Sequence, residues 1–252
     1  MARGDWAIGS VVALTALLSC AAPAAVPEPA LNVAYTAQNE PPYVLMSNGE
    51  LAGGLIHDIA AELGAALHRR PVFVLLSRNR IEAGLLDGTA DLYCGLNPGW
   101  VTAPDKLRWS PVLFNDPDVF VLRAGDPPIR DWPDLRGRRV GTILGYRYEA
   151  PLTALFADGS VQRDDAESLA SNFERLERGW IDAVLASELV IRYRQHIDPR
   201  LAQFAASPLI EAPNEVYCAA SDRPGQPAAP IIDSLATLKA AGRIEAMLAR
   251  YR

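Results

Sequence analysis

Short apolar segments alternate with amphipathic ones along this chain, and this alternation favours an α/β fold. The expected elements of the first half are strands at 31–35, 72–76 and 90–96, and helices at 55–67 and 80–86. In the helix at 55–67, apolar residues recur at helical spacing, from Leu55 through Ile59 to Leu67. Strand–helix–strand–helix–strand order predicts a parallel sheet covered by helices.

The second half repeats this organisation and then returns to the first. Its expected elements are strands at 119–122, 139–144, 181–185 and 216–219, and helices at 149–156, 168–177, 188–195 and 231–251. The closing helix has no strand partner in the second unit, so we place it on the first. The chain would then cross between two lobes twice, near 119–123 and near 215–219, which predicts a hinge and a cleft that closes around a small ligand. The expected division is 26–122 for lobe 1, 123–214 for lobe 2 and 215–252 for the return to lobe 1.

The first 25 residues have the pattern of an export signal rather than of a fold element. A charged start precedes an apolar run from Trp6 to Leu18, which is too short for a permanent membrane span. Leu17-Leu18-Ser19-Cys20 is typical of a lipoprotein signal with a lipid on Cys20, whereas Ala22-Pro23-Ala24 is typical of a site that releases a soluble protein. An uncleaved N-terminal anchor is the third alternative. In the first two cases the mature protein is periplasmic. A lipid on Cys20, in the first case, would be its only attachment to the membrane.

Composition argues against several classes of function. The 252 residues carry a net charge of −6, which does not suit a nucleic-acid surface. Only two lysines are present, Lys106 and Lys239, so Schiff-base catalysis is not expected. His57, His68 and His196 are isolated from one another and from the cysteines, so we expect no metal site, and no motif indicates a cofactor.

Several short motifs follow one another in an order that resembles the extracellular solute-binding proteins of family three, the polar amino-acid class. They are Pro41-Pro42-Tyr43 with Gly53-Gly54-Leu55, the run 86–91 (LDGTAD), Trp109-Ser110-Pro111, the run 134–141 (DLRGRRVG) and the run 179–183 (GWIDA). The resemblance covers nearly the whole mature chain. It implies a two-lobe periplasmic-binding-protein-like α/β fold of type II, a monomer that binds a small molecule, and an ABC-type membrane permease as partner.

Two departures from the family's pattern change the expected ligand. Members that bind α-amino acids carry an arginine for the ligand carboxylate after the third strand, and this position holds Ala103 here. They also carry an aspartate for the ligand ammonium, and this position holds Ser187. Because a buried zwitterion without partners is costly, we expect a small polar, acidic solute that is not a standard α-amino acid. A shift of register that brings Arg108 or Glu188 into these roles is the alternative.

Charged residues in both halves are candidates for binding such a solute. Arg78 and Arg147, one in each lobe, would bind an acidic group, with a solvated residue at a helix start as the alternative for Arg78. Glu40 would accept hydrogen bonds from the ligand, or else be an exposed acid in a loop.

Aromatic and small polar residues complete the predicted site. Tyr43, Trp100 and Tyr146 would supply flat walls, with a place in the core as the alternative for Tyr43. Asn97 ends a strand at the mouth of the cleft, and Ser187 would be a small polar contact.

Cys94 and Cys218 remain as a pair if Cys20 is lipidated or removed. In the family's sheet order their strands are neighbours, so the resemblance implies that a cross-strand disulfide is possible, and an oxidising compartment would favour it. Two buried thiols packed as small apolar groups are the alternative.

The leading interpretation of function is a transport binding protein that makes and breaks no bond. The first alternative is an enzyme on the same fold, like the cyclohexadienyl dehydratases, for which Glu40 and Glu188 are the only obvious acid or base. The second is a ligand-sensing subunit for a membrane receptor. We assign no catalytic residue.

Overall fold

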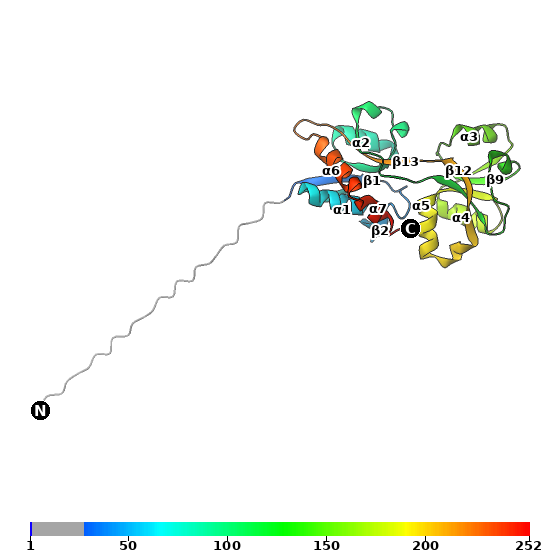
Figure 1. The fold of residues 1–252 in the computed structure, drawn as a ribbon, viewed down its shortest axis with the longest axis horizontal. Coiled ribbons are helices and arrows are strands. Elements are labelled where there is room, and N and C mark those ends of the chain that lie inside the picture. Colours follow the sequence, from blue (N-terminus) through cyan, green and yellow to red (C-terminus); the bar gives the residue numbers. More distant parts are fainter. Residues whose placement is uncertain (2–27) are drawn as a thin grey trace.

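The structure is a computed structural model that describes Met1 and residues 28–252. Apart from Met1, the expected export signal at 1–25, with Cys20 and both alternative processing sites, lies outside the described residues. The described chain forms two α/β bodies, lobe 1 with the two ends of residues 28–252 and lobe 2 with the middle (Figure 1). Within residues 28–252, no helix combines the length and the apolar character that crossing a bilayer requires.

Lobe 1 is built on parallel strands joined by one returning antiparallel strand. Its strands are β1 (Ala30–Tyr35), β2 (Leu45–Ser47), β3 (Glu50–Gly53), β4 (Arg70–Leu75), β5 (Tyr93–Leu96), β6 (Arg108–Trp109), β7 (Phe114–Asn115) and β13 (Glu215–Ala220). Its helices are α1 (Leu55–Leu67), α2 (Ile81–Asp87), α6 (Ala229–Ala240) and α7 (Arg243–Leu248). β1 pairs in parallel with β4, and a parallel bridge from Val33 to Leu92 leads to β5. β13 runs antiparallel to β5, β6 and β7.

Side chains of β1 that point to opposite faces of the sheet are buried in two different apolar cores of lobe 1. Leu31 and Val33 are buried in the core that also contains the apolar face of α1 and residues of α6 and α7. Ala34 belongs to a smaller core with Ile81 and Leu85 of α2. Successive side chains of a strand point to opposite faces, so helices cover this sheet on both sides.

The closing helix is broken where the sequence predicts a continuous one. α6 ends at Ala240 and α7 starts at Arg243, because Gly242 between them has φ of 70°, in the left-handed region that glycine adopts readily. Both helices pack on α1, and Arg243 of α7 also forms an ion pair with Glu62 of α1. The return to lobe 1 is therefore made by two helices.

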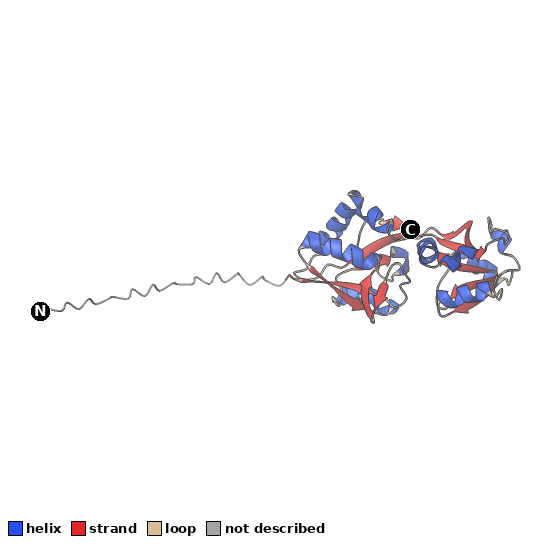
Figure 2. Ribbon diagram, turned by 90° about the horizontal axis from the view of Figure 1, so that it is seen from below, coloured by secondary structure: helices blue, strands red, loops and turns tan. Residues whose placement is uncertain are grey.

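Lobe 2 contains a five-stranded sheet in the order β10-β9-β11-β8-β12. Its strands are β8 (Asp118–Arg123), β9 (Arg139–Ile143), β10 (Gln162–Ala166), β11 (Ala183–Ser187) and β12 (Phe204–Ala212). Its helices are α3 (Ala150–Ala157), α4 (Leu169–Glu177) and α5 (Glu188–Ile197). β9, β10 and β11 are parallel, whereas β8 is antiparallel to β11 and β12. Helices lie against the strands in both lobes (Figure 2).

The position of β8 corrects the boundary expected between the lobes. We placed residues up to 122 in lobe 1, but β8 pairs only with strands of lobe 2. Val119 and Val121 are buried in one core of lobe 2, and Phe120 and Leu122 in the other. Lobe 2 therefore begins before Asp118, because both faces of this strand are covered by its own helices.

The two crossings between the lobes lie next to each other. One runs from the end of β7 at Asn115 to Asp118, and the other from Ala212 to the start of β13 at Glu215. The backbone N–H of Asp116 donates to the carbonyl oxygen of Asn214 at 3.0 Å. The two short segments thus form a hydrogen-bonded hinge between two separately packed bodies.

Cys94 of β5 and Cys218 of β13 are directly opposite in the ladder and are joined by a disulfide bond. Their sequence separation is 124 residues, so the bond closes a loop that contains all of lobe 2. It also fastens the returning strand to lobe 1. Long loops of this kind lose the most entropy in the unfolded chain when they are closed.

We expect the double variant Cys94→Ala/Cys218→Ala to have a free energy of unfolding about 2–4 kcal/mol below the wild type, because the unfolded chain gains freedom. Denaturant unfolding followed by circular dichroism measures this difference. Wild type reduced with dithiothreitol should fall to a similar value. Equal stability of the oxidised and reduced wild type would contradict this account.

Candidate functional site

The predicted site residues follow the carboxyl ends of parallel strands in both lobes. Arg78 lies after β4, and Asn97 and Trp100 lie after β5. In lobe 2, Tyr146 follows β9 and Ser187 ends β11. In α/β sheets, ligands bind outside the carboxyl ends of the strands. The strand order therefore directs these segments of both lobes towards their junction.

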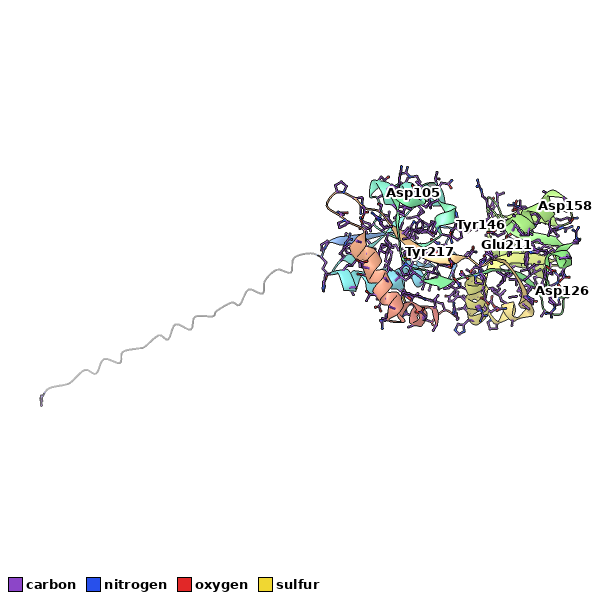
Figure 3. The ribbon with its side chains drawn as sticks, turned by 45° about the horizontal axis from the view of Figure 1, so that its top comes forward. Asp105, Asp126, Tyr146, Asp158, Glu211 and Tyr217 are labelled. Atoms are coloured by element: carbon purple, nitrogen blue, oxygen red, sulfur yellow. A yellow bond between two sulfur atoms is a disulfide. The ribbon has the colours of Figure 1, made fainter. Side chains whose placement is uncertain are left out.

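Three predicted residues meet across the lobes around one guanidinium group. Arg78 Nη1 donates a hydrogen bond to the hydroxyl of Tyr146 at 3.1 Å. The Arg78 Cζ atom lies over the Tyr146 ring, 4.8 Å from its centroid, and over the Trp100 ring at 5.9 Å. Figure 3 shows Tyr146 on the side of lobe 2 that faces lobe 1. We call Arg78, Trp100 and Tyr146 the interlobe cluster.

Arg78 also differs from most arginines of the described chain in lacking an acidic partner. No carboxylate of residues 28–252 lies within salt-bridge distance of its guanidinium, and the residue is exposed. Its neighbour Arg80, by contrast, pairs with Asp87. Arg78 therefore presents donors that a ligand carboxylate or a similar anion can use.

A second set of contacts across the lobes centres on Asp116, which is 4% exposed. Its Oδ2 accepts from the Tyr43 hydroxyl at 2.6 Å and from Ser187 Oγ at 2.5 Å, and its Oδ1 accepts from the backbone N–H of Leu189 at 2.9 Å. Leu189 itself packs in the apolar core of lobe 1. Tyr43 and Ser187 thus hold the start of α5 against lobe 1.

Burial shifts the pKa values of this group. Burial raises the pKa of Asp116, and the hydrogen bonds from Ser187 and Tyr43 oppose that rise. Burial and the adjacent Asp116 carboxyl raise the pKa of the Tyr43 hydroxyl well above its usual value, so the phenol stays a donor.

Two further acids lie at the hinge. Burial raises the pKa of Asp118 to about 7, and although a hydrogen bond from Asn214 Nδ2 at 2.7 Å opposes the rise, the charges of Asp116 and Glu211 add to it. Burial also raises the pKa of Glu211, which accepts from the backbone N–H of Glu149 at 2.6 Å. The sequence analysis missed all three acids. The run Asp116-Pro117-Asp118 at a crossing is the one signal that could have indicated them.

The other predicted residues have partners of their own or none. Glu40 forms an ion pair with Arg194 of α5 at 2.6 Å, which is a third contact across the lobes. Asn97 donates to the carbonyl oxygen of Glu215 at 3.0 Å and accepts from the N–H of Gly99, so it holds its own turn. Arg147 is exposed and lies shortly before α3. Within the described residues, no hydrogen bond links it to the interlobe cluster.

The alternative residues are also engaged elsewhere. Arg108 Nε bonds Asp222 at 2.7 Å, and Glu188 pairs with Arg192 at 2.6 Å. A shifted register that uses Arg108 or Glu188 as ligand clamps would have to break these pairs.

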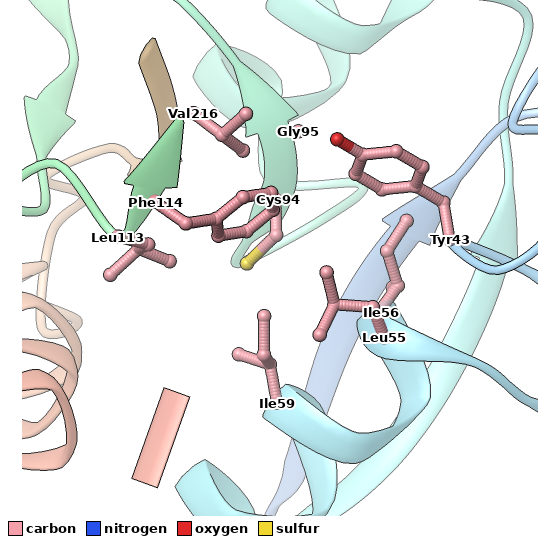
Figure 4. A pocket seen from close by; sticks show the side chains of 9 residues that line it. All are labelled: Tyr43, Leu55, Ile56, Ile59, Cys94, Gly95, Leu113, Phe114 and Val216. Atoms are coloured by element: carbon pink, nitrogen blue, oxygen red, sulfur yellow. The ribbon is translucent and has the colours of Figure 1, made fainter. Parts of the chain in front are cut away.

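Two cavities lie in lobe 1. The first lies beneath Tyr43 and beside Phe114 and Gly95, is almost wholly apolar, and is too narrow for a water molecule (Figure 4). The second, of about 260 Å³, lies near the starts of β4 and β5, where Arg69 and Arg223 share the buried carboxylate of Asp91. In the part of the chain that the structure describes, no group of three or more His, Cys, Asp or Glu side chains could hold a metal ion.

Solved structures resemble this chain in fold. An ancestral arginine-binding protein bound to arginine superposes with a TM-score of 0.70 at 20% identity, over 88% of this chain and 97% of that one. The chain has the two-lobe periplasmic-binding-protein-like fold of type II.

Other neighbours have the same architecture at low identity. Substrate-binding domain 2 of GlnP from Lactococcus lactis, in an open conformation, has a TM-score of 0.65 at 15% identity, over 90% of this chain and 97% of that one. The GluR0 ligand-binding core from Nostoc punctiforme, in complex with L-glutamate, has a TM-score of 0.66 at 18% identity, over 88% and 98%. No protein-family model and no curated protein sequence matches the chain.

We expect Tyr43→Phe to lower the free energy of unfolding by about 1.5–3 kcal/mol, because a buried carboxyl group loses one of its donors. Urea unfolding measures the change. Tyr35→Phe is the matched control, since Tyr35 is also a buried tyrosine of lobe 1 but its hydroxyl makes no hydrogen bond to the described residues. A loss no larger than that of the control would show that the Tyr43–Asp116 contact does not hold the lobes.

Asp118 should make stability depend on pH. Its folded pKa of about 7 exceeds that of an unfolded aspartate near 3.8, so the folded state binds this proton more tightly. The contribution of this proton to the free energy of unfolding is fully present below about pH 4. It declines as pH rises to about 7, by at most about 1.4 kcal/mol per pH unit.

The variant Asp118→Asn should lack this decline and should therefore gain stability relative to wild type between pH 5 and pH 8. Urea unfolding at the two pH values tests this. Asp105→Asn, which alters an exposed carboxylate outside the hinge, should follow the wild-type profile. A difference between Asp118→Asn and wild type that stays constant with pH would contradict the assignment.

Proposed function

We propose that the chain is an extracytoplasmic solute-binding protein that captures a small polar, acidic solute between its lobes and delivers it to an ABC-type permease. The observation that carries this proposal is Arg78, a guanidinium group without an acidic partner that reaches from lobe 1 to lobe 2. The fold supports it, because neighbours of the same fold include substrate-binding domains of amino-acid ABC transporters. The motif order quoted above, similar to family three, points the same way.

Closure of the lobes follows from the position of Arg78. Its guanidinium can bind a carboxylate through two parallel hydrogen bonds, in a geometry that lysine does not provide. A ligand held there also meets Tyr146 of lobe 2, so part of the binding energy is gained only when the lobes are closed. A hinge with two crossings converts that gain into closure.

A standard α-amino acid fits this site less well than a simple acid. Ala103 offers no charge for an α-carboxylate, and Ser187 donates to Asp116 instead of standing open to a ligand ammonium. Asp116 supplies a carboxyl group close to that position, but three donors already surround it. An ammonium group placed there would compete with bonds that hold the lobes together.

Location and assembly belong to the same proposal. The mature chain would work in the periplasm as a monomer, with or without a lipid on Cys20, and Arg147 would join Arg78 on the ligand from the side of lobe 2. The disulfide between Cys94 and Cys218 supports an oxidising compartment.

An enzyme on this fold is the second candidate, because Asp118 provides an observation in its favour. A carboxyl group with a pKa of about 7 is suited to take and return a proton near neutral pH. Glu40 and Glu188, the acids first considered, are each paired with an arginine. Chromatography of each acid after incubation with the protein separates the candidates, since a binding protein returns it unchanged.

A thermal-shift and calorimetric panel of acetate, succinate, benzoate, arginine, glutamine and glutamate tests the proposal. We expect at least one simple carboxylate to bind saturably and to raise the melting temperature. Arg78→Gln should weaken that binding by about 1.5–3 kcal/mol, or roughly 10- to 150-fold, through the lost charge-assisted bonds.

Arg80→Gln is the matched control, because Arg80 lies in the same short turn (Arg78–Arg80) but pairs with Asp87. It should leave affinity unchanged. Binding of an α-amino acid that is indifferent to Arg78→Gln would overturn the proposed ligand class.

A further inference from the structure

Large aromatic surfaces are left open at the interlobe cluster. Trp100 is 49% exposed and Tyr146 is 36% exposed, although both rings contact the Arg78 guanidinium. Leaving apolar surface in water is unfavourable in proportion to its area. Open aromatic faces on both sides of a charged group at the junction of two lobes are typical of a binding site.

The rings of this site already stack on one flat group. The planar Arg78 guanidinium lies over the rings of both Trp100 and Tyr146, and the exposed surface of these rings is suited to a further flat group. A carboxylate that bonds the fork of a guanidinium bidentately lies in nearly the same plane as that fork. The rest of the ligand then lies in this plane or projects out of it, depending on the geometry of the carbon that carries the carboxylate.

This geometry separates planar acids from tetrahedral ones. When the carboxylate is attached to an aromatic ring, the ring can continue the plane and slide along the two aromatic faces. When it is attached to a tetrahedral carbon, the substituents project out of the plane towards Trp100 and Tyr146. Offset stacking of aromatic faces adds about 0.5–1.5 kcal/mol beyond area burial, or roughly a 3- to 10-fold gain in affinity.

Further aromatic and polar side chains surround the interlobe cluster. Tyr148 stacks on Tyr146 with ring centroids 6.4 Å apart, and Arg163 lies over Tyr148 at 5.3 Å. The hydroxyl of Tyr93 accepts from Asn39 Nδ2 at 3.3 Å. Burial raises the pKa of Tyr93 while the Arg78 charge opposes the rise, which agrees with a position of this hydroxyl near the guanidinium.

We infer that the ligand is an aromatic carboxylate, with its carboxylate on Arg78 and its ring against the faces of Trp100 and Tyr146. The inference rests on the proposed function and narrows its acidic solute to one class. It uses a guanidinium that has no acidic partner, whereas the carboxyl groups of Asp116, Asp118 and Glu211 already accept hydrogen bonds from the protein.

The test compares benzoate with cyclohexanecarboxylate by isothermal titration calorimetry. These two acids carry the same charge on rings of the same number of carbons, but only benzoate is flat and aromatic. Wild type should bind benzoate at least about 10-fold more tightly, since stacking and the fit of the plane both favour it. Trp100→Leu and Tyr146→Leu should each weaken benzoate binding about 3- to 10-fold and reduce the preference.

Trp180→Leu is the matched control, because Trp180 is 54% exposed and contacts Arg178 away from the interlobe cluster. It should leave both affinities unchanged. Both altered aromatics are exposed, and circular dichroism of each variant verifies its fold.

Two results overturn the inference without touching the proposed function. The first is that wild type binds benzoate and cyclohexanecarboxylate with equal affinity, and that this binding is lost in Arg78→Gln but unchanged in Trp100→Leu. The second is no binding of benzoate while another acid of the panel binds in an Arg78-dependent manner. If no acid binds at all, the proposed function fails together with the inference.

Discussion

The carboxyl group of Asp116 is the point at which the two lobes are joined. It accepts hydrogen bonds from a loop of lobe 1 through Tyr43, from the end of β11 through Ser187 and from the first turn of α5 through Leu189. Its own backbone N–H binds the second crossing at Asn214. A buried acid is tolerated only when donors replace water, and these donors come from segments far apart in the sequence. This one side chain therefore ties a loop of lobe 1 to the end of β11 and the start of α5 in lobe 2.

The acidic groups of the hinge and the guanidinium of Arg78 belong to separate sets of contacts. Asp118 and Glu211 add two carboxyl groups with raised pKa values to the buried crossing, and no arginine or lysine of the described residues pairs with either. The guanidinium of Arg78 lies instead among exposed aromatic rings and lacks an acidic partner. Under the proposed function, a carboxylate between the lobes would bind Arg78 rather than the hinge, whose acids offer it no donor. The same separation explains why a zwitterion gains little here, because the hinge acids already have donors.

The alternation of strands and helices was predictable because it depends on local periodicity. The sheet to which each strand belongs could not be predicted, as β8 shows. Its residues Val119 to Leu122 are apolar on both faces, and this pattern does not identify the neighbouring strands. The break at Gly242 was missed because the apolar stripe continues on both sides of it. The place of Arg78 after a strand could be predicted from the strand pattern, whereas its role in binding stays a prediction. Asp116 could not, since polar residues beside a proline resemble a solvated turn until contacts with Tyr43 and Ser187, some 70 residues away, bury them.

A crystal structure of the protein with benzoate tests the central claim most directly. We predict electron density for a carboxylate on the Arg78 guanidinium, with the ring against Trp100 and Tyr146 and both lobes in contact with it. Density at the Arg69–Arg223 cavity of lobe 1 alone, or a benzoate held by one lobe without Arg78, would contradict the account.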